Sequence, residues 1–469
     1  MSSEIQKVIS GGYCIGCGGC TLGREDSGMR IELDALGRYQ ARIAGVSEDA
    51  WSRLDQVCPF SNSAADEDEL ATGIHEAPGL RTESHLGRFL EVLAGHVAEA
   101  GFRGQGSSGG FTSWILAELL RRGMVDAVIH VKPRHPDPTD PAMFRYEVSR
   151  TIEELRQGAK SHYYPVEMSG ILEVIRATPG RYALVGVPCF IKAIRLLARQ
   201  EPVFRERVKF SIGLFCGHLK STGFAELLAW QAGVKPDQLR SIDFRTKIPD
   251  RPASQYGITV TGTADGEPIV RTAAMADLIG ADWGMGFFKY KACDFCDDIS
   301  AETADVSVGD AWLPQFVSDS QGTNVIVIRN IQIKALVDEG MESGRLRFAP
   351  LAVDQAVESQ NANVRHRRQG LAYRLHLLDL TKEWRPRKRV DPAPMEDKRR
   401  AAVLEQRIRF REVVPLLWSD AVARGSLESF LKSVGLLIQD YKDFRPRPQL
   451  LRRGLKHRLK KFVKSCLGR

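Results

Sequence analysis

The spacing of the cysteines constrains this chain more than any other feature of its sequence. Three cysteines form a C-x-x-C-x-x-C run within YCIGCGGC, and a fourth follows far downstream in VCPF, directly before a proline. We call these four residues the first set: Cys14, Cys17, Cys20 and Cys58. Glycines between the cysteines let backbone amides turn toward the sulfurs, and a distant Cys-Pro can complete the four ligands of a cubane. The run therefore predicts a [4Fe–4S] cluster.

Structural zinc is the alternative interpretation of the first set. Zinc sites usually combine two separate C-x-x-C pairs, or pairs of Cys and His, around one ion. A triple run followed by Cys-Pro is closer to the ligand pattern of bacterial ferredoxins, except that here the fourth cysteine lies much further along the chain. We favour a cluster over zinc, and either of them over unliganded thiols.

Four further cysteines are dispersed through the middle of the chain. We call them the second set: Cys189 in VGVPC, Cys216 in GLFC, and Cys293 and Cys296 in KACDFCDD. A lone cysteine after a strand is more often a buried apolar residue, and a C-x-x-C pair alone could be redox-active or half of a zinc site. The residues by themselves leave a second cluster and these alternatives equally open. Of the nine cysteines, only Cys466 belongs to neither set.

The positive charge is concentrated at one end of the chain. The 469 residues carry a formal net charge of +8, yet residues 445–469 contain ten Lys or Arg and no acidic residue, so subtracting ten leaves −2 for the rest. A nucleic-acid-binding protein would carry its basic charge within the fold, and we therefore expect no nucleic-acid partner. Leucines and other apolar residues accompany the basic ones in this tail. Contact with a membrane surface or an acidic partner and a solvated helix end are equally consistent with this pattern.

The sequence predicts a cytoplasmic protein. No apolar stretch approaches the roughly 18–20 residues that a membrane span needs. The N-terminal residues MSSEIQKVISGGYC have neither an apolar core nor a small-residue cleavage site, so they do not resemble a secretory signal. Thiols stay reduced in the cytoplasm, so the nine cysteines favour metal ligation over disulfides.

The order of hydrophobic and turn-forming segments predicts an α/β fold, α+β overall, in three parts. Residues 1–85 form a small ferredoxin-like iron–sulfur segment that includes a hairpin in MRIELDALGRYQARI. Residues 86–345 form an α/β domain with a mixed sheet, whose buried strands we expect in RYALVGV, VKFSIGLF and TNVIVIRN. We expect helices over residues 111–122 and in FIKAIRLLARQ, after Pro188. Residues 346–469 form a helical C-terminal region that ends in the basic tail.

Two loops are candidates for a flavin site. The loop GQGSSGGFTSW, residues 104–114, places small residues directly before a helix, where backbone amides and the positive end of the helix dipole suit a pyrophosphate. It matches neither a Walker loop nor a regular dinucleotide fingerprint, and a flexible turn is equally consistent with it. The second loop, GAKSHYYPV, offers Lys160, Ser161 and Tyr163, although a surface loop is the simpler interpretation of Lys160. ADVSVGDAW, which contains Asp310, favours a strand followed by a structural turn.

Taken in order, these motifs resemble a known family. The sequence GSSGGFTSW, KSHYYPV, VGVPC, GLFC, CDFCDD and ADVSVGDAW looks like that of the coenzyme F420 hydrogenase and dehydrogenase beta subunits. Relatives of that family include 7-hydroxymethyl chlorophyll a reductase and the flavin module of some archaeal sulfite reductases. The resemblance covers roughly residues 10–335. One departure is His162, which stands where many relatives have a lysine, so a substrate-phosphate role for that stretch does not carry over.

The resemblance implies a bound FAD, at least one [4Fe–4S] cluster and, in members with two clusters, an N-terminal ferredoxin-like segment. The second set would ligate a cluster near the flavin, and the first set a cluster further from it. The FAD would meet residues of the two loops: Gly106, Ser107, Ser108, Gly109, Gly110, Thr112, Lys160, Ser161 and Tyr163. A flavin can exchange two electrons with an organic substrate and single electrons with clusters.

The sequence therefore predicts an oxidoreductase that passes electrons between a small organic substrate, FAD, two clusters and a redox protein. The substrate would be similar to coenzyme F420 or be another small molecule, and the redox protein would be a ferredoxin or a component of a complex. We also expect the chain to be part of an oligomer. One alternative is a non-catalytic electron-transfer subunit of a larger oxidoreductase. Another is a zinc-stabilised binding protein with a degenerate flavin fold.

Overall fold

The protein is described by a computed structural model that covers residues 2–134 and 142–444. The basic tail and Cys466 lie outside these residues, so the expectation of a membrane or acidic partner there stays a prediction. No helix in the described part of the chain is both long enough and apolar enough to cross a membrane.

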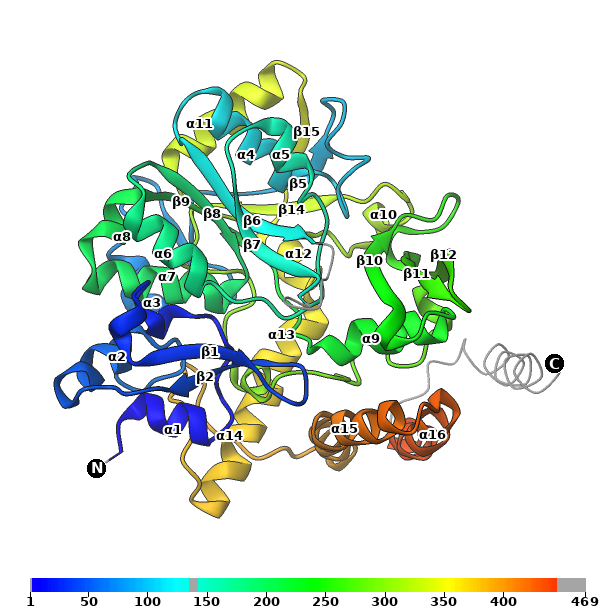
Figure 1. Cartoon of the computed structure of the whole chain (residues 1–469). Helices are drawn as coiled ribbons and strands as arrows, with labels where there is room; N and C mark the ends of the chain where they lie inside the picture. The colour runs from blue at the N-terminus through cyan, green and yellow to red at the C-terminus, as the bar shows by residue number, and fades with distance from the viewer. Residues whose placement is uncertain (1, 135–141, 445–469) are drawn as a thin grey trace.

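An eight-stranded mixed sheet forms the centre of the molecule (Figure 1), in the order β15-β5-β14-β13-β9-β8-β6-β7. Its strands are β5 (Glu91–Val97), β6 (Ala127–Pro133), β7 (Phe144–Ser149), β8 (Tyr182–Gly186), β9 (Val208–Leu214), β13 (Val306–Asp310), β14 (Asn324–Ile328) and β15 (Leu346–Pro350). The strands β8 and β14 are buried along their whole length, as expected where both faces of a sheet are covered. The predicted strands in RYALVGV, VKFSIGLF and TNVIVIRN are confirmed as β8, β9 and β14.

Helices cover both faces of this sheet. In β8, Ala183 and Val185 pack in one core cluster with side chains of α4 and α11, whereas Tyr182 and Leu184 pack in another with side chains of α6 and α7. The helices are α4 (Phe111–Arg121), α5 (Ile152–Arg156), α6 (Ser169–Ala177), α7 (Pro188–Gln200), α8 (Pro202–Arg207), α10 (Pro314–Val317) and α11 (Ile331–Glu342). The predicted helices over residues 111–122 and in FIKAIRLLARQ are confirmed, and α7 begins at a proline, whose missing N–H costs no helical hydrogen bond there.

The direction of the strands decides where the site lies. The strand β6 runs parallel to β8, β8 to β9, and β9 to β13. Their neighbours at the outer positions, β7 and β14, run antiparallel to them. The carboxyl ends of the four parallel strands therefore meet at one edge of the sheet, which is where ligands bind in open α/β sheets.

The N-terminal segment packs on the α6 and α7 side of the sheet. The predicted hairpin is confirmed as two antiparallel strands that pair from Met29↔Ile43 to Leu33↔Tyr39. One core cluster joins Ile5 and Val57 of this segment with Leu172 and Ile191. Its elements are α1 (Glu4–Ser10), β1 (Met29–Leu33), β2 (Tyr39–Ile43), α2 (Trp51–Val57), α3 (Glu67–Thr72), β3 (Arg81–Glu83) and β4 (Gly87–Phe89). The boundaries at residues 85 and 345 stay predictions.

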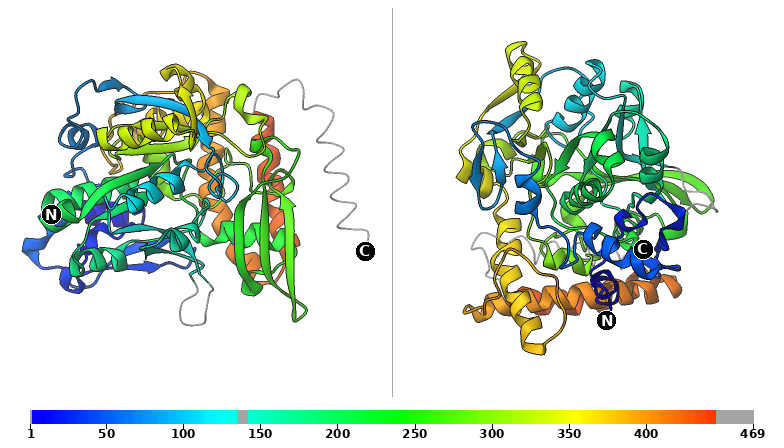
Figure 2. Two further views of the ribbon diagram at one scale, coloured as in Figure 1. Left: turned by 90° about the horizontal axis from the view of Figure 1, so that it is seen from above. Right: turned by 90° about the vertical axis from the view of Figure 1, so that its left-hand side faces the viewer.

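A second, three-stranded sheet lies beside the C-terminal helices, as two further views make clear (Figure 2). Its strands, which were not predicted, are β10 (Leu239–Thr246), β11 (Gly257–Ala264) and β12 (Glu267–Ala274). Apolar side chains of β10 and β11 share a core cluster with α9, α15 and α16. The helices of this part are α9 (Thr222–Gln231), α12 (Val353–Glu358), α13 (Asn361–Arg367), α14 (Gln369–Thr381), α15 (Lys398–Ala423) and α16 (Leu427–Phe444), which confirm the helical character of the C-terminal region.

Candidate functional site

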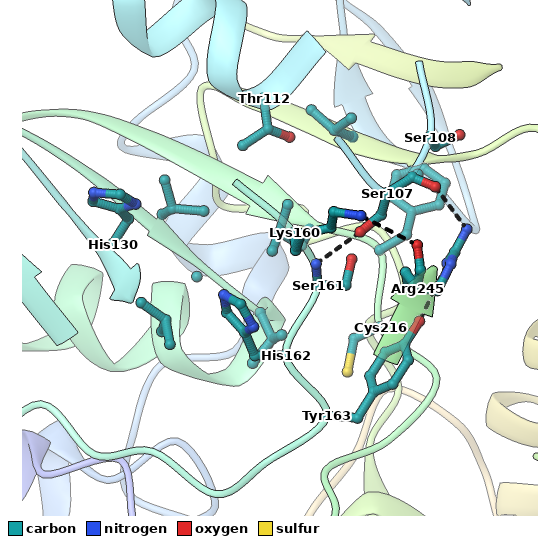
Figure 3. A pocket seen from close by; sticks show the side chains of 18 of the residues that line it. Ser107, Ser108, Thr112, His130, Lys160, Ser161, His162, Tyr163, Cys216 and Arg245 are labelled. Atoms are coloured by element: carbon teal, nitrogen blue, oxygen red, sulfur yellow. Dashed lines mark hydrogen bonds between the residues drawn. The ribbon is translucent and has the colours of Figure 1, made fainter. Parts of the chain in front are cut away.

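A cavity opens at the edge of the sheet where the parallel strands end. It is lined by the glycine-rich loop that follows β5, by residues 158–166, by the ends of β8, β9 and β13, and by Arg245 of β10 (Figure 3). Eight of the nine predicted flavin-binding residues line it: Gly106, Ser107, Ser108, Gly110, Thr112, Lys160, Ser161 and Tyr163. The topology thus brings together two loops that are about fifty residues apart in the sequence.

Gly109 is the predicted residue that does not line the cavity. A Cβ atom at this position would lie 2.7 Å from the Asn324 side chain and 2.9 Å from the carbonyl oxygen of Gly95. Gly109 therefore lets the loop pack closely against β5 and β14. Any larger residue at this position would push the loop away from the sheet.

The glycine-rich loop ends at the first turn of α4. Gly110 is the N-cap residue, with a φ of 87°, and Asn324 accepts a hydrogen bond of 3.1 Å from the backbone N–H of Phe111. A Cβ atom at Gly110 would lie 2.8 Å from the backbone nitrogen of Arg103, so only glycine fits here without a shift of the chain. Thr112 lies in the first turn, where backbone N–H groups and the helix dipole favour an anion.

Arg245 connects the two loops with β13. Its guanidinium donates hydrogen bonds to Tyr163 Oη (3.2 Å), to the carbonyl oxygen of Ser107 (3.2 Å) and to the carboxylate of Asp310 (3.0 and 3.3 Å). Only 4% of its surface is exposed, and its buried Nε atom has no hydrogen-bond partner among the described residues. Sequence reasoning missed Arg245, because it lies on a strand that no motif marked.

The second loop is fixed to the first by Ser161 and held to β10 by Lys160. The backbone N–H of Ser161 donates a hydrogen bond of 2.8 Å to Ser107 Oγ. Lys160 Nζ lies 3.0 Å from the carboxylate of Asp243, so its charge is paired within the protein. The arrangement agrees with the simpler interpretation of Lys160 as a structural residue, although it lines the cavity.

His162 presents an unpaired ring nitrogen in this cavity. The ring stacks on Phe144 at a centroid distance of 4.4 Å, and the buried Nε2 atom has no hydrogen-bond partner among the described residues. Burial lowers the pKa of His162 to about 4, so its imidazole is neutral near pH 7. The Nε2 atom of a neutral imidazole can either donate a hydrogen bond to a bound molecule or accept one from it.

His218 and Lys220 line the cavity next to the second set, and sequence reasoning missed both. His218 packs edge-on against Trp283, and its buried Nε2 atom also lacks a partner among the described residues. Lys220 is buried and donates a hydrogen bond of 2.7 Å to the carbonyl oxygen of Phe287. The GLFCGHLK stretch that carries them follows β9, and this position after a parallel strand is the signal that could have found them.

The first set is gathered within the N-terminal segment. The sulfur of Cys14 accepts hydrogen bonds of 3.3 Å from the backbone N–H groups of Gly16 and Ala41, and the sulfur of Cys17 accepts one of 3.5 Å from Gly19. Burial raises the pKa of the Cys20 thiol well above its ordinary value, and the charges of its three partners in the set raise it further. The four sulfurs are therefore electrostatic neighbours.

The second set is assembled from three separate parts of the chain. Cys189 lies in the first turn of α7, Cys216 follows β9, and Cys293 and Cys296 lie in and just after a short 3₁₀ helix, residues 291–295. Burial raises the pKa of the Cys189 thiol well above its ordinary value, and the charges of Cys296, Cys216 and Cys293 raise it further. The fold thus brings together the four residues that were dispersed in the sequence.

The second set borders the cavity and also lies near the first set. Cys216 is itself a lining residue of the cavity, where Figure 3 labels it. Cys189 packs against the core cluster that contains Cys17 and Cys20 of the first set.

Each set offers the donor chemistry of an iron–sulfur cluster. Four partly or fully buried thiols that resist ionisation become thiolates when a metal compensates their charge. Among the described residues, no three His, Cys, Asp or Glu side chains are arranged to bind one single metal ion. A cubane distributes its four thiolates over four iron atoms, and backbone N–H groups directed at the sulfurs are among the features that set its potential.

Two protein-family models match this chain, and they describe the two ends of one protein, the beta subunit of coenzyme F420 hydrogenase/dehydrogenase. The model of its N-terminal part matches residues 92–173. The model of its C terminus matches residues 180–354. Together they span the eight-stranded sheet, apart from its very first residue, and all four cysteines of the second set.

Curated relatives are similar at a low level of identity. The coenzyme F420 hydrogenase subunit beta of Methanococcus voltae is 24% identical over 268 residues, which are 56% of this chain and 84% of that protein. An uncharacterized protein of Methanocaldococcus jannaschii is 24% identical over 253 residues, 53% of this chain and 84% of that protein. The coenzyme F420-dependent sulfite reductase of the same organism is 22% identical over 345 residues, 70% of this chain and 46% of that protein.

Among solved structures, a chain of the xenon-derivatised F420-reducing [NiFe] hydrogenase complex from Methanosarcina barkeri is similar in fold. It is 17% identical, with a TM-score of 0.49, and the match covers 65% of this chain and 99% of that one.

Proposed function

Because the chain belongs to the coenzyme F420 hydrogenase/dehydrogenase beta subunit family, we propose that it is an iron–sulfur flavoprotein oxidoreductase. It would pass electrons between a small organic substrate and a redox protein. The family membership supports electron transfer as the general role. The identity of the cofactors, substrate and partner is our proposal.

The cavity suits a flavin nucleotide. The first turn of α4 and the hydroxyls of Ser107 and Thr112 offer donors for phosphate oxygens. The unpaired polar atoms of Arg245 and His162 offer hydrogen bonds that no described residue takes up. Bound FAD would supply exchange of two electrons with the substrate and of single electrons with the clusters.

The thiols would hold two [4Fe–4S] clusters. The second set would ligate the cluster nearer the flavin, since Cys216 borders the cavity. The first set would ligate the other cluster and exchange electrons with the redox partner, since Cys189 packs against the core cluster that contains Cys17 and Cys20. Electrons can run along this order in either direction.

The named relatives suggest the class of substrate. Two of them carry coenzyme F420 in their names, so an F420-like deazaflavin is the first candidate for the hydride donor or acceptor. The partner would be a ferredoxin or a component of a larger complex. The second candidate function, an electron-transfer subunit without its own substrate, is favoured by the name of the Methanococcus voltae relative, which is a hydrogenase subunit.

A single observation carries the proposal: the fold places a cysteine of the second set in the wall of the same cavity as the flavin-type loops. The experiment is anaerobic rapid mixing of the flavin-loaded chain with reduced coenzyme F420 or with NADH. We expect bleaching of the flavin band, followed by loss of cluster absorbance. If no small donor bleaches the flavin but a co-purifying protein reduces it, the second candidate function is favoured.

Cys216→Ser is the decisive variant in this experiment, and Cys466→Ser, which changes a cysteine outside both sets, is its control. We expect flavin bleaching without subsequent cluster reduction in Cys216→Ser, and unchanged kinetics in Cys466→Ser. Normal cluster reduction in Cys216→Ser would contradict the assigned path.

A further inference from the structure

Helix α13 contacts the second set, although it lies beyond the matched residues 180–354. Arg367, the last residue of α13, is only 1% exposed. Its Nη2 atom donates hydrogen bonds to the carbonyl oxygens of Cys216 (2.7 Å) and Gly217 (2.8 Å), and its Nε atom donates one to Asp298 (3.1 Å). One side chain thus ties the loop after β9 to the loop after Cys296.

The positive charge of Arg367 is not matched by a hydrogen-bonded carboxylate. Its three hydrogen bonds all go to backbone carbonyls, and its buried Nη1 atom has no hydrogen-bond partner among the described residues. A buried guanidinium with a free N–H edge is costly unless a negative group faces it. The hydrogen bonds of Nη2 to the carbonyl oxygens of Cys216 and Gly217 place this guanidinium beside the loop that carries Cys216.

Arg367 lies beside two of the loops that carry the second set. It hydrogen-bonds to Cys216 itself, and to Asp298, which follows Cys296 by two residues. Because its guanidinium is buried and keeps its charge, it favours negative charge on groups close to it.

Three other buried cations near Cys293 share the carboxylate of Asp294. Asp294, the residue after Cys293, is 1% exposed and lies 2.5 Å from Lys289 Nζ and 2.6 Å from Arg411 Nη1. Arg374 donates to the carbonyl oxygen of Asp294 (2.7 Å) and lies 3.8 Å from its carboxylate. Their charges are balanced largely by this carboxylate, which distinguishes them from Arg367.

We propose that Arg367 is a positioning residue that raises the reduction potential of the cluster held by the second set. This inference rests on the proposed function, because it assumes that the second set holds a cluster. One-electron reduction makes a cluster more negative, and a fixed buried cation nearby stabilises that state. Arg367 would thereby make the cluster beside the cavity easier to reduce.

The test is a redox titration of the full chain, with the reduced clusters followed by electron paramagnetic resonance. Arg367→Gln removes the charge and keeps a polar side chain. Arg367→Lys keeps the charge and loses the planar fork that reaches two carbonyls. Arg365→Gln is the matched control, because Arg365 lies on the same helix but is exposed.

We expect a more negative potential for one cluster only in Arg367→Gln, and a potential close to the wild-type value in Arg367→Lys. We expect no change in Arg365→Gln. An unchanged potential in Arg367→Gln with full iron content, or an equal shift in Arg365→Gln, would overturn the inference.

Two outcomes separate this inference from the proposed function. A wild-type chain without iron at the second set overturns both. If Arg367→Gln does not retain the cluster, the test rests on Arg367→Lys. A lowered potential in this variant, which keeps the positive charge, would mean that the hydrogen bonds and not the charge set the potential. The inference would then fail.

Discussion

The two sets of cysteines offer the same four thiols but are built in different ways. The first set depends on local spacing, and backbone N–H groups of Gly16, Gly19 and Ala41 are directed at its sulfurs. The second set depends on topology, because its members follow two different parallel strands and a distant loop. It also has a buried arginine beside it, whereas the donors to the first set are neutral amides. The comparison teaches that ligands close together in the sequence, as in the first set, can be recognised from their spacing. Ligands brought together by the fold, as in the second set, can be surrounded by side chains from anywhere in the chain.

The largest expected effect comes from removing one ligand of either set. We expect Cys17→Ser and Cys293→Ser each to lose about four iron atoms per chain, since a cubane rarely persists without a full ligand set. Cys293→Ser should also stop electron flow out of the cavity, whereas Cys17→Ser should leave reduction of the nearer cluster intact. Iron analysis and anaerobic absorbance measure both. Loss of all iron in either variant would mean that the two sets do not act independently.

A second, smaller effect is expected at the cavity, next to the second set. Arg245→Gln should weaken flavin binding about 10- to 100-fold, since hydrogen bonds to charged groups contribute about 1.5–3 kcal/mol and Asp310 would lose its partner. Fluorescence titration with FAD measures this, with Arg271→Gln on the exposed strand β12 as control. Iron at the first set should stay unchanged. Equal flavin affinity in Arg245→Gln and wild type would contradict the assignment of this cavity.

A third effect is confined to the first set. Gly16 has a φ of 65°, and a Cβ atom there would lie 2.4 Å from the carbonyl oxygen of Tyr39. Gly16→Ala should therefore lower the free energy of unfolding by about 1–3 kcal/mol and reduce iron at the first set. Gly45→Ala is the control, because Gly45 also has a positive φ but no atom lies within 4 Å of its Cβ position. If both variants lost stability equally, the close approach would not be the cause.

The smallest expected effect is a pH dependence that belongs to the cavity side. Burial lowers the pKa of His162 to about 4, whereas in the unfolded chain it is about 6.5. The unfolded state therefore binds more protons between about pH 4 and 6.5, so stability falls as the pH drops through this range. Chemical denaturation of His162→Gln should give a flatter pH profile there. His376→Gln, on the partly exposed face of α14, should keep the wild-type slope; a wild-type slope in His162→Gln would refute the assignment.

The features that could be predicted are those with a local signature. The hairpin, the strands β8, β9 and β14, and the helix after Pro188 each follow from a short hydrophobic pattern, and the structure confirms them. The glycine-rich loop of the cavity could be named because small residues before a helix have a known chemistry, and the second loop because of its side chains Lys160, Ser161 and Tyr163.

The features that were missed depend on long-range packing. Arg245 lies on β10, and Arg367 lies on a short helix whose sequence, NANVRHR, has no motif. Each becomes meaningful only through partners that are more than 60 residues away, such as Asp310 or Cys216. No window of the sequence contains that information, which is why both residues emerge only from the fold.

The measurement that tests the central claim most directly is the content of iron, acid-labile sulfide and flavin per chain after anaerobic purification. Two cubanes and one flavin predict about eight iron atoms, about eight sulfides and one FAD, with a broad cluster absorbance beneath the flavin bands. Zinc in place of iron, or neither metal nor flavin after reconstitution, would contradict the account.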